Sequence, residues 1–229
     1  MTVEFKLKTM PTYAISDIHG NKEKLARLFK TISLGKTHKL IFLGDYIDRG
    51  LNSKGVLDLI INLKESGYDI TTLRGNHEQM ILDAIKGINL ELWLRNAGEQ
   101  TLSSFYKFDV NQIPKLYLDF LNSTSLYAIH KHFILVHAGI NMKLEKPLED
   151  NHSLLWQRKW WKYYNQKWLE NRTVIHGHTP MTKRAIQHQK IQRSIICIDN
   201  GSYMTHNPEF GSICAYNLDS GEYFFSDEK

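Results

Sequence analysis

Short apolar runs rich in branched residues alternate along the chain with longer segments in which apolar residues recur every three or four positions. The short runs predict β-strands and the longer segments predict amphipathic helices. Alternation of the two is typical of a layered α/β domain, which is the fold class we expect. Five predicted strands end directly in polar, glycine-containing sequence: Tyr13–Ser16, Leu40–Leu43, Ile70–Leu73, Phe133–Val136 and Val174–His176.

Four helices are expected between and after these strands. The first should begin at Asn21 and end at Gly35, the second should run from Ser53 to Gly67, and the third should begin near His77. The inward-facing stripes of the four helices are Leu25, Leu28, Phe29 and Ile32; Val56, Leu59, Ile60 and Leu63; Met80, Ile81, Ala84 and Ile85; and Ile113, Leu116, Tyr117 and Phe120.

The second half of the chain reads mostly as β-structure. Lys131 and His132 are expected to turn one hairpin, and Asp219-Ser220-Gly221 should connect Ile213–Tyr216 to Tyr223–Phe225. The first sixteen residues alternate apolar and charged side chains as an edge strand would. No repeat, low-complexity tract or linker divides the chain, so we expect a single domain over residues 1–229.

The composition fits a domain with a real core, because 42% of the 229 residues are hydrophobic. The amino terminus lacks the apolar run of a signal peptide, and no stretch is long enough to cross a bilayer. Cys197 and Cys214 lie in strand-like runs without zinc-ligand or CxxC spacing, which predicts reduced core residues. Together these features predict a cytoplasmic protein without membrane contact.

The formal charge of +5 favours anionic partners such as phosphopeptides or nucleic acid. The lysines are scattered over predicted helix faces, so a solvated surface is the better interpretation and no nucleic-acid partner is expected. The sequence contains no coiled coil or extended apolar segment that would indicate an oligomeric state.

The carboxyl ends of the five strands carry the informative residues, because ligands of open α/β sheets bind at these ends. Each end alone is weak evidence for a site. Together they offer oxygen and imidazole ligands without cysteine, a set that suits manganese, iron or zinc. The five sequences are Asp17-Ile18-His19-Gly20, Gly44-Asp45-Tyr46-Ile47-Asp48-Arg49-Gly50, Gly75-Asn76-His77-Glu78, His137-Ala138-Gly139 and Gly177-His178-Thr179.

The blocks SDIHGN, FLGDYIDRG, RGNHEQM, VHAGI and GHTP, which lie between Tyr13 and Pro180, resemble those of the metal-dependent phosphoprotein phosphatases. Their order and spacing are similar to the small bacterial and phage branch of that family, within the calcineurin-like metallophosphoesterases. The later stretch CIDNGSY resembles the family's closing strands. The resemblance implies a metallophosphoesterase fold: a central β-sandwich of mixed sheets flanked by helices, with the site in a cleft at the sheet ends.

The resemblance also implies two divalent metal ions and their ligands. Manganese is the expected metal, and the same nitrogen and oxygen atoms would accept iron or zinc. A water held between two ions ~4 Å apart would attack phosphorus in line, without a covalent enzyme intermediate. The implied ligands are Asp17 and His19 for the first ion, Asn76, His137 and His178 for the second, and Asp45 as the bridge.

Four further residues are implied in catalysis. His77 would protonate the leaving oxygen while Asp48 holds it, and such a proton donor is worth roughly 10²–10⁴ in rate. Arg49 would bind phosphate oxygens through its fixed fork of donors. Arg158, in LLWQRKWW, is similar to a Trp-x-Arg element of bacterial members and is the second expected phosphate clamp; an ordinary surface cation is the competing interpretation.

Two other features have competing interpretations. His176 shares a strand face with His178, yet a core or supporting role is favoured over a place beside the metal. Asp199-Asn200-Gly201 differs from the Asp-Thr-Gly of relatives, so its role stays open, like that of Tyr203. An aromatic stripe that recurs every four residues is expected to face the core from one helix rather than form a lid over the substrate; it consists of Trp156, Trp160, Tyr164 and Trp168.

The expected function is hydrolysis of phosphomonoesters, with phosphoserine or phosphothreonine in proteins as the leading substrate. The first alternative is a dinucleoside polyphosphate hydrolase of the diadenosine tetraphosphate type, or a nucleotide-end hydrolase, with the same metal site. Phosphotyrosine and phosphohistidine also stay open, because the machinery reads the phosphate more than the side chain. A scaffold without activity is disfavoured, since every ligand and the His77–Asp48 pair are present.

Overall fold

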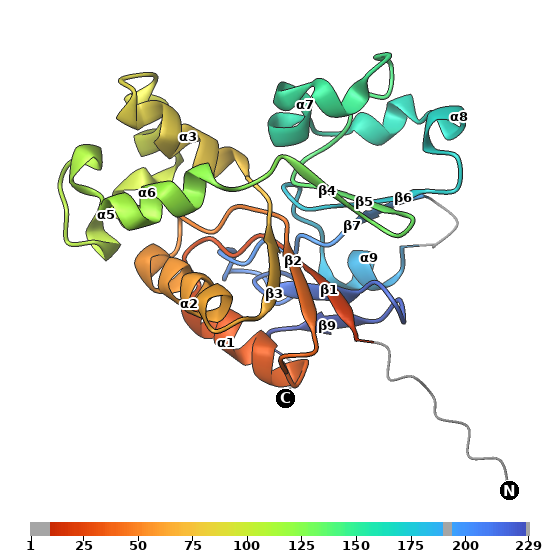
Figure 1. The fold of residues 1–229 in the computed structure, drawn as a ribbon, viewed down its shortest axis with the longest axis horizontal. Helices are drawn as coiled ribbons and strands as arrows, with labels where there is room; N and C mark the ends of the chain where they lie inside the picture. The colour runs from red at the N-terminus through yellow and green to blue at the C-terminus, as the bar shows by residue number, and fades with distance from the viewer. Residues whose placement is uncertain (1–9, 190–193, 228–229) are drawn as a thin grey trace, which may run out of the picture.

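The computed structural model describes residues 10–189 and 194–227, and within them helices and strands follow one another from β1 to β9 (Figure 1). The strands are β1 (Thr12–Ile15), β2 (Lys39–Phe42), β3 (Asp69–Thr72), β4 (Tyr127–His130), β5 (Phe133–Val136), β6 (Thr173–His176), β7 (Ile195–Cys197), β8 (Cys214–Asn217) and β9 (Tyr223–Phe225). The helices are α1 (Lys22–Thr31), α2 (Ser53–Glu65), α3 (Asn76–Ile85), α4 (Leu90–Trp93), α5 (Glu99–Ser104), α6 (Lys115–Asn122), α7 (Asn151–Trp156), α8 (Gln166–Leu169) and α9 (Lys183–Gln187). Short helical turns are η1 (Leu94–Gly98), η2 (Val110–Gln112), η3 (Pro147–Glu149) and η4 (Trp160–Tyr163).

The strands form two sheets. The first sheet has the order β3-β2-β1-β8-β9, and the second has the order β4-β5-β6-β7. Both are mixed: β1 is parallel to β2 and antiparallel to β8, while β5 is antiparallel to β4 and parallel to β6. The α/β fold with mixed sheets is therefore confirmed.

Central strands of the sandwich contribute to two apolar cores. In β2, Leu40 and Phe42 pack into a core with the helices, whereas Ile41 packs into the core between the sheets. In β5, Leu135 enters the same inter-sheet core, and Ile134 faces the opposite side. Successive strand residues point to opposite faces, so a strand covered on both faces must be apolar throughout. This explains why these strands read as continuous apolar runs.

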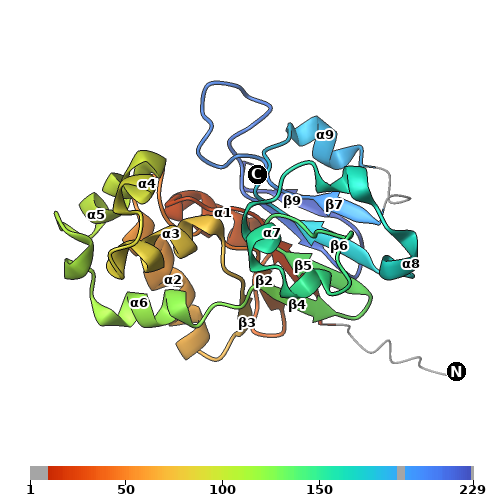
Figure 2. The same ribbon diagram turned by 90° about the horizontal axis from the view of Figure 1, so that it is seen from above.

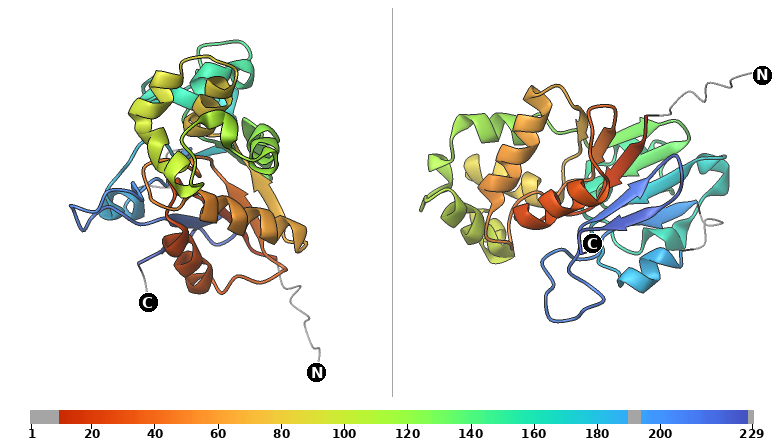
Figure 3. Two further views of the ribbon diagram at one scale, coloured as in Figure 1. Left: turned by 90° about the vertical axis from the view of Figure 1, so that its left-hand side faces the viewer. Right: turned by 90° about the horizontal axis from the view of Figure 1, so that it is seen from below.

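Helices cover the outer faces of the sandwich. α1 and α2 pack against the first sheet through fully buried residues such as Leu25 and Val56. Trp160 of η4 and Leu169 of α8 share a core with Val174 of β6 on the outer face of the second sheet. The helices α3 to α6 gather at one end of the molecule, away from β4 to β7 (Figure 2). The segment between β7 and β8 forms a long loop that projects from the sheets (Figure 3).

Three predicted helices are confirmed, with shifts at their ends. α2 begins at Ser53 and ends shortly before Gly67, which has a φ of +82°. α3 begins at Asn76, one residue before the predicted start. α1 ends earlier than predicted, because Ser33 (φ 48°) takes the left-handed conformation that we expected at Gly35.

Prediction is weaker between α3 and β4. The fourth helix exists as α6 and buries Tyr117 and Phe120, but the stripe is wrong at Leu116, which is 56% exposed. The sequence pattern also misses the α4–α5 segment, because non-helical backbone at Asn96 and Ala97 breaks its helical period.

The edge-strand prediction for the amino terminus is wrong for residues 12–15. β1 lies in the middle of its sheet between β2 and β8, and its residues are buried on both faces. Residues 1–9, which carry the rest of that prediction, lie outside the described residues. Both predicted hairpins are confirmed, the first with a left-handed Lys131 (φ 53°).

Cys197 and Cys214 are buried and free, as predicted. Over residues 10–189 and 194–227, each helix is too short or too polar to cross a bilayer.

The aromatic stripe does not lie on one helix. α7 ends at Trp156, and Lys159 adopts a left-handed conformation (φ 54°) before η4 and α8 follow. Trp160 is fully buried, whereas Tyr164 is 41% exposed. The prediction of a single core-facing helix is therefore wrong, because the turn at Lys159 redirects the side chains that follow it.

Candidate active site

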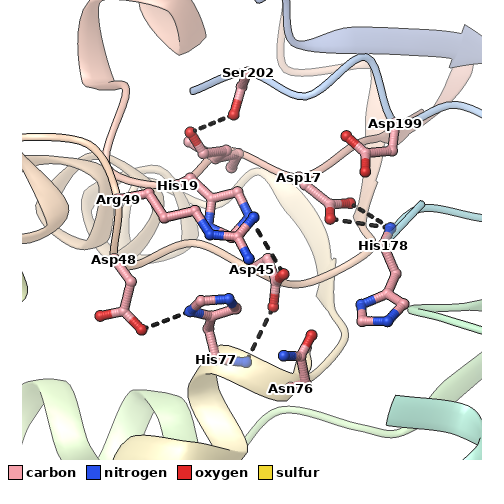
Figure 4. A network of polar contacts seen from close by, with 12 residues as sticks. Asp17, His19, Asp45, Asp48, Arg49, Asn76, His77, His178, Asp199 and Ser202 are labelled. Atoms are coloured by element: carbon pink, nitrogen blue, oxygen red, sulfur yellow. Dashed lines mark hydrogen bonds and ion pairs between the residues drawn. The ribbon is translucent and has the colours of Figure 1, made fainter. Parts of the chain in front are cut away.

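The predicted metal ligands meet where strands of both sheets end. Five of them follow β1, β2, β5 and β6, and the sixth opens α3 directly after β3. They form one buried polar network, and none is more than 6% exposed (Figure 4). The residues are Asp17, His19, Asp45, Asn76, His137 and His178.

The backbone that carries the site has an uncommon conformation. His19, Asp45, Asp48, Arg49 and His178 have φ values between 46° and 68°, which residues other than glycine adopt rarely. Such strain costs of order 1–3 kcal/mol per residue and clusters at functional sites. The loops after β1 and β2 support each other, since the carbonyl of Asp45 accepts the N–H of His19 at 2.8 Å.

Asp45 lies between two groups of ligand atoms. Its Oδ2 is 3.4 Å from Nε2 of His19, and its Oδ1 is 3.5 Å from Nε2 of His137. Among the described residues, His19, Asp45 and His77 bring ligand atoms within 4.8 Å of one another, and so do Asp45, His137 and His178. Asp45 is the member common to both groups, which is the position expected of a bridging ligand.

Hydrogen bonds to the backbone fix which ring nitrogen each histidine offers. Nδ1 of His137 donates to the carbonyl of Leu43 at 3.0 Å, so its Nε2 carries a lone pair. That Nε2 lies 3.0 Å from Oδ1 of Asn76 and 3.1 Å from Nδ1 of His178. Nδ1 of His19 likewise donates to the carbonyl of Ile47 at 3.0 Å. Lone pairs therefore converge beside Asp45, an arrangement that fits a cation.

Burial favours the neutral form of the predicted ligand histidines. It lowers the pKa of His19 and His137 below the usual range and lowers the pKa of His178 to about 2. A neutral imidazole is the form that binds a metal ion.

Buried carboxylates gather beside these rings. The Asp17 carboxylate accepts the backbone N–H of His178 at 3.0 Å. Burial raises the pKa of Asp17, and the charges of Asp199 and Asp45 raise it further. Burial also raises the pKa of Asp199 to about 7. Carboxylates that repel one another in a dry site fit a bound cation, because the cation would remove that repulsion.

His77 is oriented by a different kind of partner. Its Nδ1 lies 2.6 Å from Oδ2 of Asp48, and both side chains are fully buried. Burial opposes the charged ring, but Asp45 and Asp48 outweigh it and raise the pKa of His77. Nε2 of His77 is buried and has no hydrogen-bond partner in the part of the chain that the structure describes. A buried nitrogen without a partner fits an atom that acts on a ligand.

Further buried residues hold the site together, although they do not lie at the ends of strands. Trp93 and Thr101, from the α4–α5 segment, donate hydrogen bonds to the Asp48 carboxylate. Glu78 accepts the backbone N–H groups of Asp45 (2.7 Å), Tyr46 and Gly75 (both 2.9 Å), and so ties the β2 loop to α3. The signal for Glu78 is its place at the third position of a helix, as in a capping box.

The two predicted phosphate clamps differ in their surroundings. Nη1 of Arg49 lies 3.2 Å from Nε2 of His19, and its guanidinium lies over the ring of Tyr203, 4.2 Å from the centroid. Arg158 is exposed. Burial is the main cause of the low pKa of His178, and the charges of His137 and then of Arg158 lower it further.

His176 packs into the core. Its Nδ1 donates to the carbonyl of Gly177 at 3.0 Å, and its ring meets Trp160 edge to face, with centroids 5.3 Å apart. Burial lowers its pKa to about 4.

Comparison with known proteins identifies the family. The sequence model of the family described as calcineurin-like phosphoesterase matches residues 10–214. The chain belongs to the calcineurin-like phosphoesterases.

Curated relatives of this phosphoesterase match over part of its length. Serine/threonine-protein phosphatase 1 of Salmonella typhimurium is 40% identical over 88 residues, which cover 38% of this chain and 38% of the relative. A protein of Caenorhabditis elegans provisionally named a serine/threonine-protein phosphatase is 43% identical over 82 residues, or 35% of this chain and 22% of the relative. The matched stretch thus spans well under half the length of either relative.

A solved structure shows the same fold over nearly the whole chain. It belongs to a protein provisionally named a diadenosine tetraphosphatase, and it aligns with a TM-score of 0.68 at 18% sequence identity. The alignment covers 96% of this chain and 94% of the other.

Proposed function

We propose that this phosphoesterase hydrolyses phosphomonoesters with the help of two divalent metal ions, and that phosphoserine or phosphothreonine in proteins is its substrate. One observation carries the proposal: His77, which Asp48 holds through Nδ1, brings a ring nitrogen close to the ligand atoms of His19 and Asp45, and its Nε2 has no hydrogen-bond partner among the described residues. A proton donor and a metal site side by side are what cleavage of a poor leaving group requires.

The converging lone pairs support an assignment of the residues that would hold the ions. Asp45 would be shared, and manganese is the metal we expect, with iron or zinc also suited to nitrogen and oxygen ligands. The bound ions would supply the positive charge that lowers the pKa of a water and stabilises the phosphoryl oxygens. Asp17 and His19 would complete one site, and Asn76, His137 and His178 would complete the other.

The remaining residues would act on the phosphate and on the leaving group. His77 would donate the proton on Nε2 to the leaving oxygen, and Asp48 would hold the ring in position through Nδ1. When metal binds Nε2 of His19, Arg49 would give up its contact with that nitrogen. Its guanidinium would then donate N–H groups to phosphate oxygens. Arg158, which is exposed and whose charge acts on His178, would provide the second clamp.

The relatives support a phosphoprotein substrate, since both matched proteins are named serine/threonine-protein phosphatases. The fold likeness to the provisionally named diadenosine tetraphosphatase keeps the dinucleotide as the second candidate. The proposal also includes a cytoplasmic location, where the enzyme would meet its phosphoprotein substrate.

The two candidates are separated by one experiment. The protein is stripped of metal and reloaded with manganese, and it is then given a phosphoserine peptide and diadenosine tetraphosphate side by side. Manganese-dependent phosphate release from the peptide is the expected result, and an Asp45→Asn variant should abolish it. Cleavage of the dinucleotide alone would replace the proposal with a nucleotide hydrolase. Inactivity on both substrates with two ions bound would contradict both candidates.

A further inference from the structure

The Asp48 carboxylate is held by more than its histidine. Oδ2 lies 2.6 Å from Nδ1 of His77, and Oδ1 accepts the hydroxyl of Thr101 at 2.6 Å. The indole N–H of Trp93 lies 3.0 Å from Oδ2 and 3.1 Å from Oδ1, so it bridges both oxygens. A fully buried carboxylate with a donor on each oxygen and a third across the two has one orientation.

The hydroxyl of Thr101 has one proton, and its neighbours determine where this proton points. The backbone N–H of Asp48 donates to Oγ of Thr101 at 3.0 Å. Oγ of Ser53 lies 2.9 Å from the same atom. Since an ionised carboxylate only accepts hydrogen bonds, Thr101 must donate to Asp48 and accept from Asp48 N–H and Ser53. This circuit fixes the backbone and the side chain of Asp48 together.

Trp93 and Thr101 lie in the α4–α5 segment, apart from the loops that carry the proposed metal ligands. They lie on α4 and α5, on either side of the left-handed Ala97 (φ 70°), which folds the two helices around Asp48. The indole is fully buried, and a side chain at Gly98 would collide with it. No residue of this segment is a proposed metal ligand or touches one by a hydrogen bond in the described chain.

We infer that Trp93 and Thr101 are positioning residues for the proton donor: they hold the Asp48 carboxylate in one orientation, and Asp48 in turn aims Nε2 of His77 at the leaving oxygen. The kinetic part of this inference rests on the proposed function. Because the pair acts through His77, it should matter for substrates whose leaving group needs a proton and not for those whose leaving group departs as a stable anion.

Two substitutions remove the donors without emptying the core. Trp93→Phe removes the N–H and keeps an aromatic ring, and Thr101→Val removes the hydroxyl at nearly constant volume. On the manganese-loaded enzyme, each should lower kcat for a phosphoserine peptide by about 10-fold. This loss is smaller than the roughly 10²–10⁴ that the proton donor itself contributes to the rate. Neither should change kcat for p-nitrophenyl phosphate by more than about 2-fold, and KM and metal content should stay unchanged.

The controls separate positioning from a loss of packing. Thr101→Ser keeps the hydroxyl and should restore turnover of the peptide. Thr124→Val is the matched control, because Thr124 is also buried and its hydroxyl bonds to the carbonyl of Leu121 and to Arg74, away from Asp48. Equal losses on both substrates, or full activity of both variants on the peptide, would overturn the inference.

A second measurement does not depend on the substrate. In the zinc-loaded protein, which lacks the paramagnetic broadening of manganese, the proton in the short bond between His77 and Asp48 should give a downfield proton NMR resonance that is absent in His77→Asn. It should shift or broaden in Trp93→Phe and Thr101→Val and persist in Thr101→Ser and Thr124→Val. An unchanged resonance in the first two variants would overturn the positioning role. If the wild-type enzyme fails to cleave the peptide, the proposed function is wrong. The resonance still tests whether Trp93 and Thr101 hold Asp48 and His77 in position.

Discussion

His77 differs from the proposed ligand histidines in the atom that accepts its Nδ1–H. A neutral backbone carbonyl accepts Nδ1–H of His19 and of His137, whereas the carboxylate of Asp48 accepts it in His77. A carbonyl partner favours the neutral ring that binds metal, and a carboxylate favours the charged ring that can donate a proton. The partner of each ring thus supports the proposed division of roles between metal ligand and general acid.

Replacement of His77 tests this division. His77→Asn should retain bound metal and lose about 10²–10⁴ in kcat on a phosphoserine peptide, because the leaving alkoxide would depart without a proton. The loss on p-nitrophenyl phosphate should be much smaller, since its leaving group needs little protonation. Steady-state kinetics on both substrates and metal analysis check the prediction. Equal losses on the two substrates at full metal content would show that His77 is not the general acid.

At the scale of elements, the site depends on how closely two sheets approach. Gly177 follows β6, and its N–H donates to the carbonyl of His137 at 2.8 Å. A side chain here would collide with Oδ1 of Asp17, which follows β1 in the other sheet. Glycine at this position thus lets the loop after β6 lie against Asp17 after β1, so that proposed ligands from the two sheets meet.

The Gly177→Ala variant should weaken metal binding. The added methyl group would displace Asp17, and a displaced ligand should lower affinity for the first ion by about 10-fold. Titration of the metal-free protein with manganese measures this change. Gly35→Ala is the matched control, because a Cβ at Gly35 meets no atom within 4 Å. Equal affinities of Gly177→Ala and wild type would show that Asp17 is not held by this contact.

The elements also show how far sequence reasoning reaches. The strands β1, β2, β5 and β6 were predictable because burial makes them nearly continuous apolar runs, and their carboxyl ends indicated the loops that carry the predicted ligands. β3, with the sequence DITT, is more exposed, and its prediction rested on its branched residues. The α4–α5 segment was not predictable, because a left-handed Ala97 interrupts its period and Trp93 resembles an ordinary core residue. Its contact with Asp48 is tertiary and leaves no periodic signal. The prediction of a single helix for the aromatic stripe is wrong for the same reason, because the left-handed Lys159 interrupts the helical period.

At the scale of the whole molecule, the site joins both sheets. Ligands from the first sheet and its helix α3 meet His137 and His178, which follow β5 and β6 of the second sheet. The family match over residues 10–214 includes β1 to β3 of the first sheet and β4 to β7 of the second, which agrees with a site that needs both sheets. The extent of the domain over residues 1–229 stays a prediction, and so does the role of each ligand.

The most direct test of the account is the metal content of the purified protein after manganese loading, measured for the wild type and for Asp45→Asn. The account predicts two ions per wild-type chain and a loss of at least one in the variant, because Asp45 belongs to both groups of ligand atoms. Two ions retained by Asp45→Asn, or no ion bound by the wild type, would contradict it.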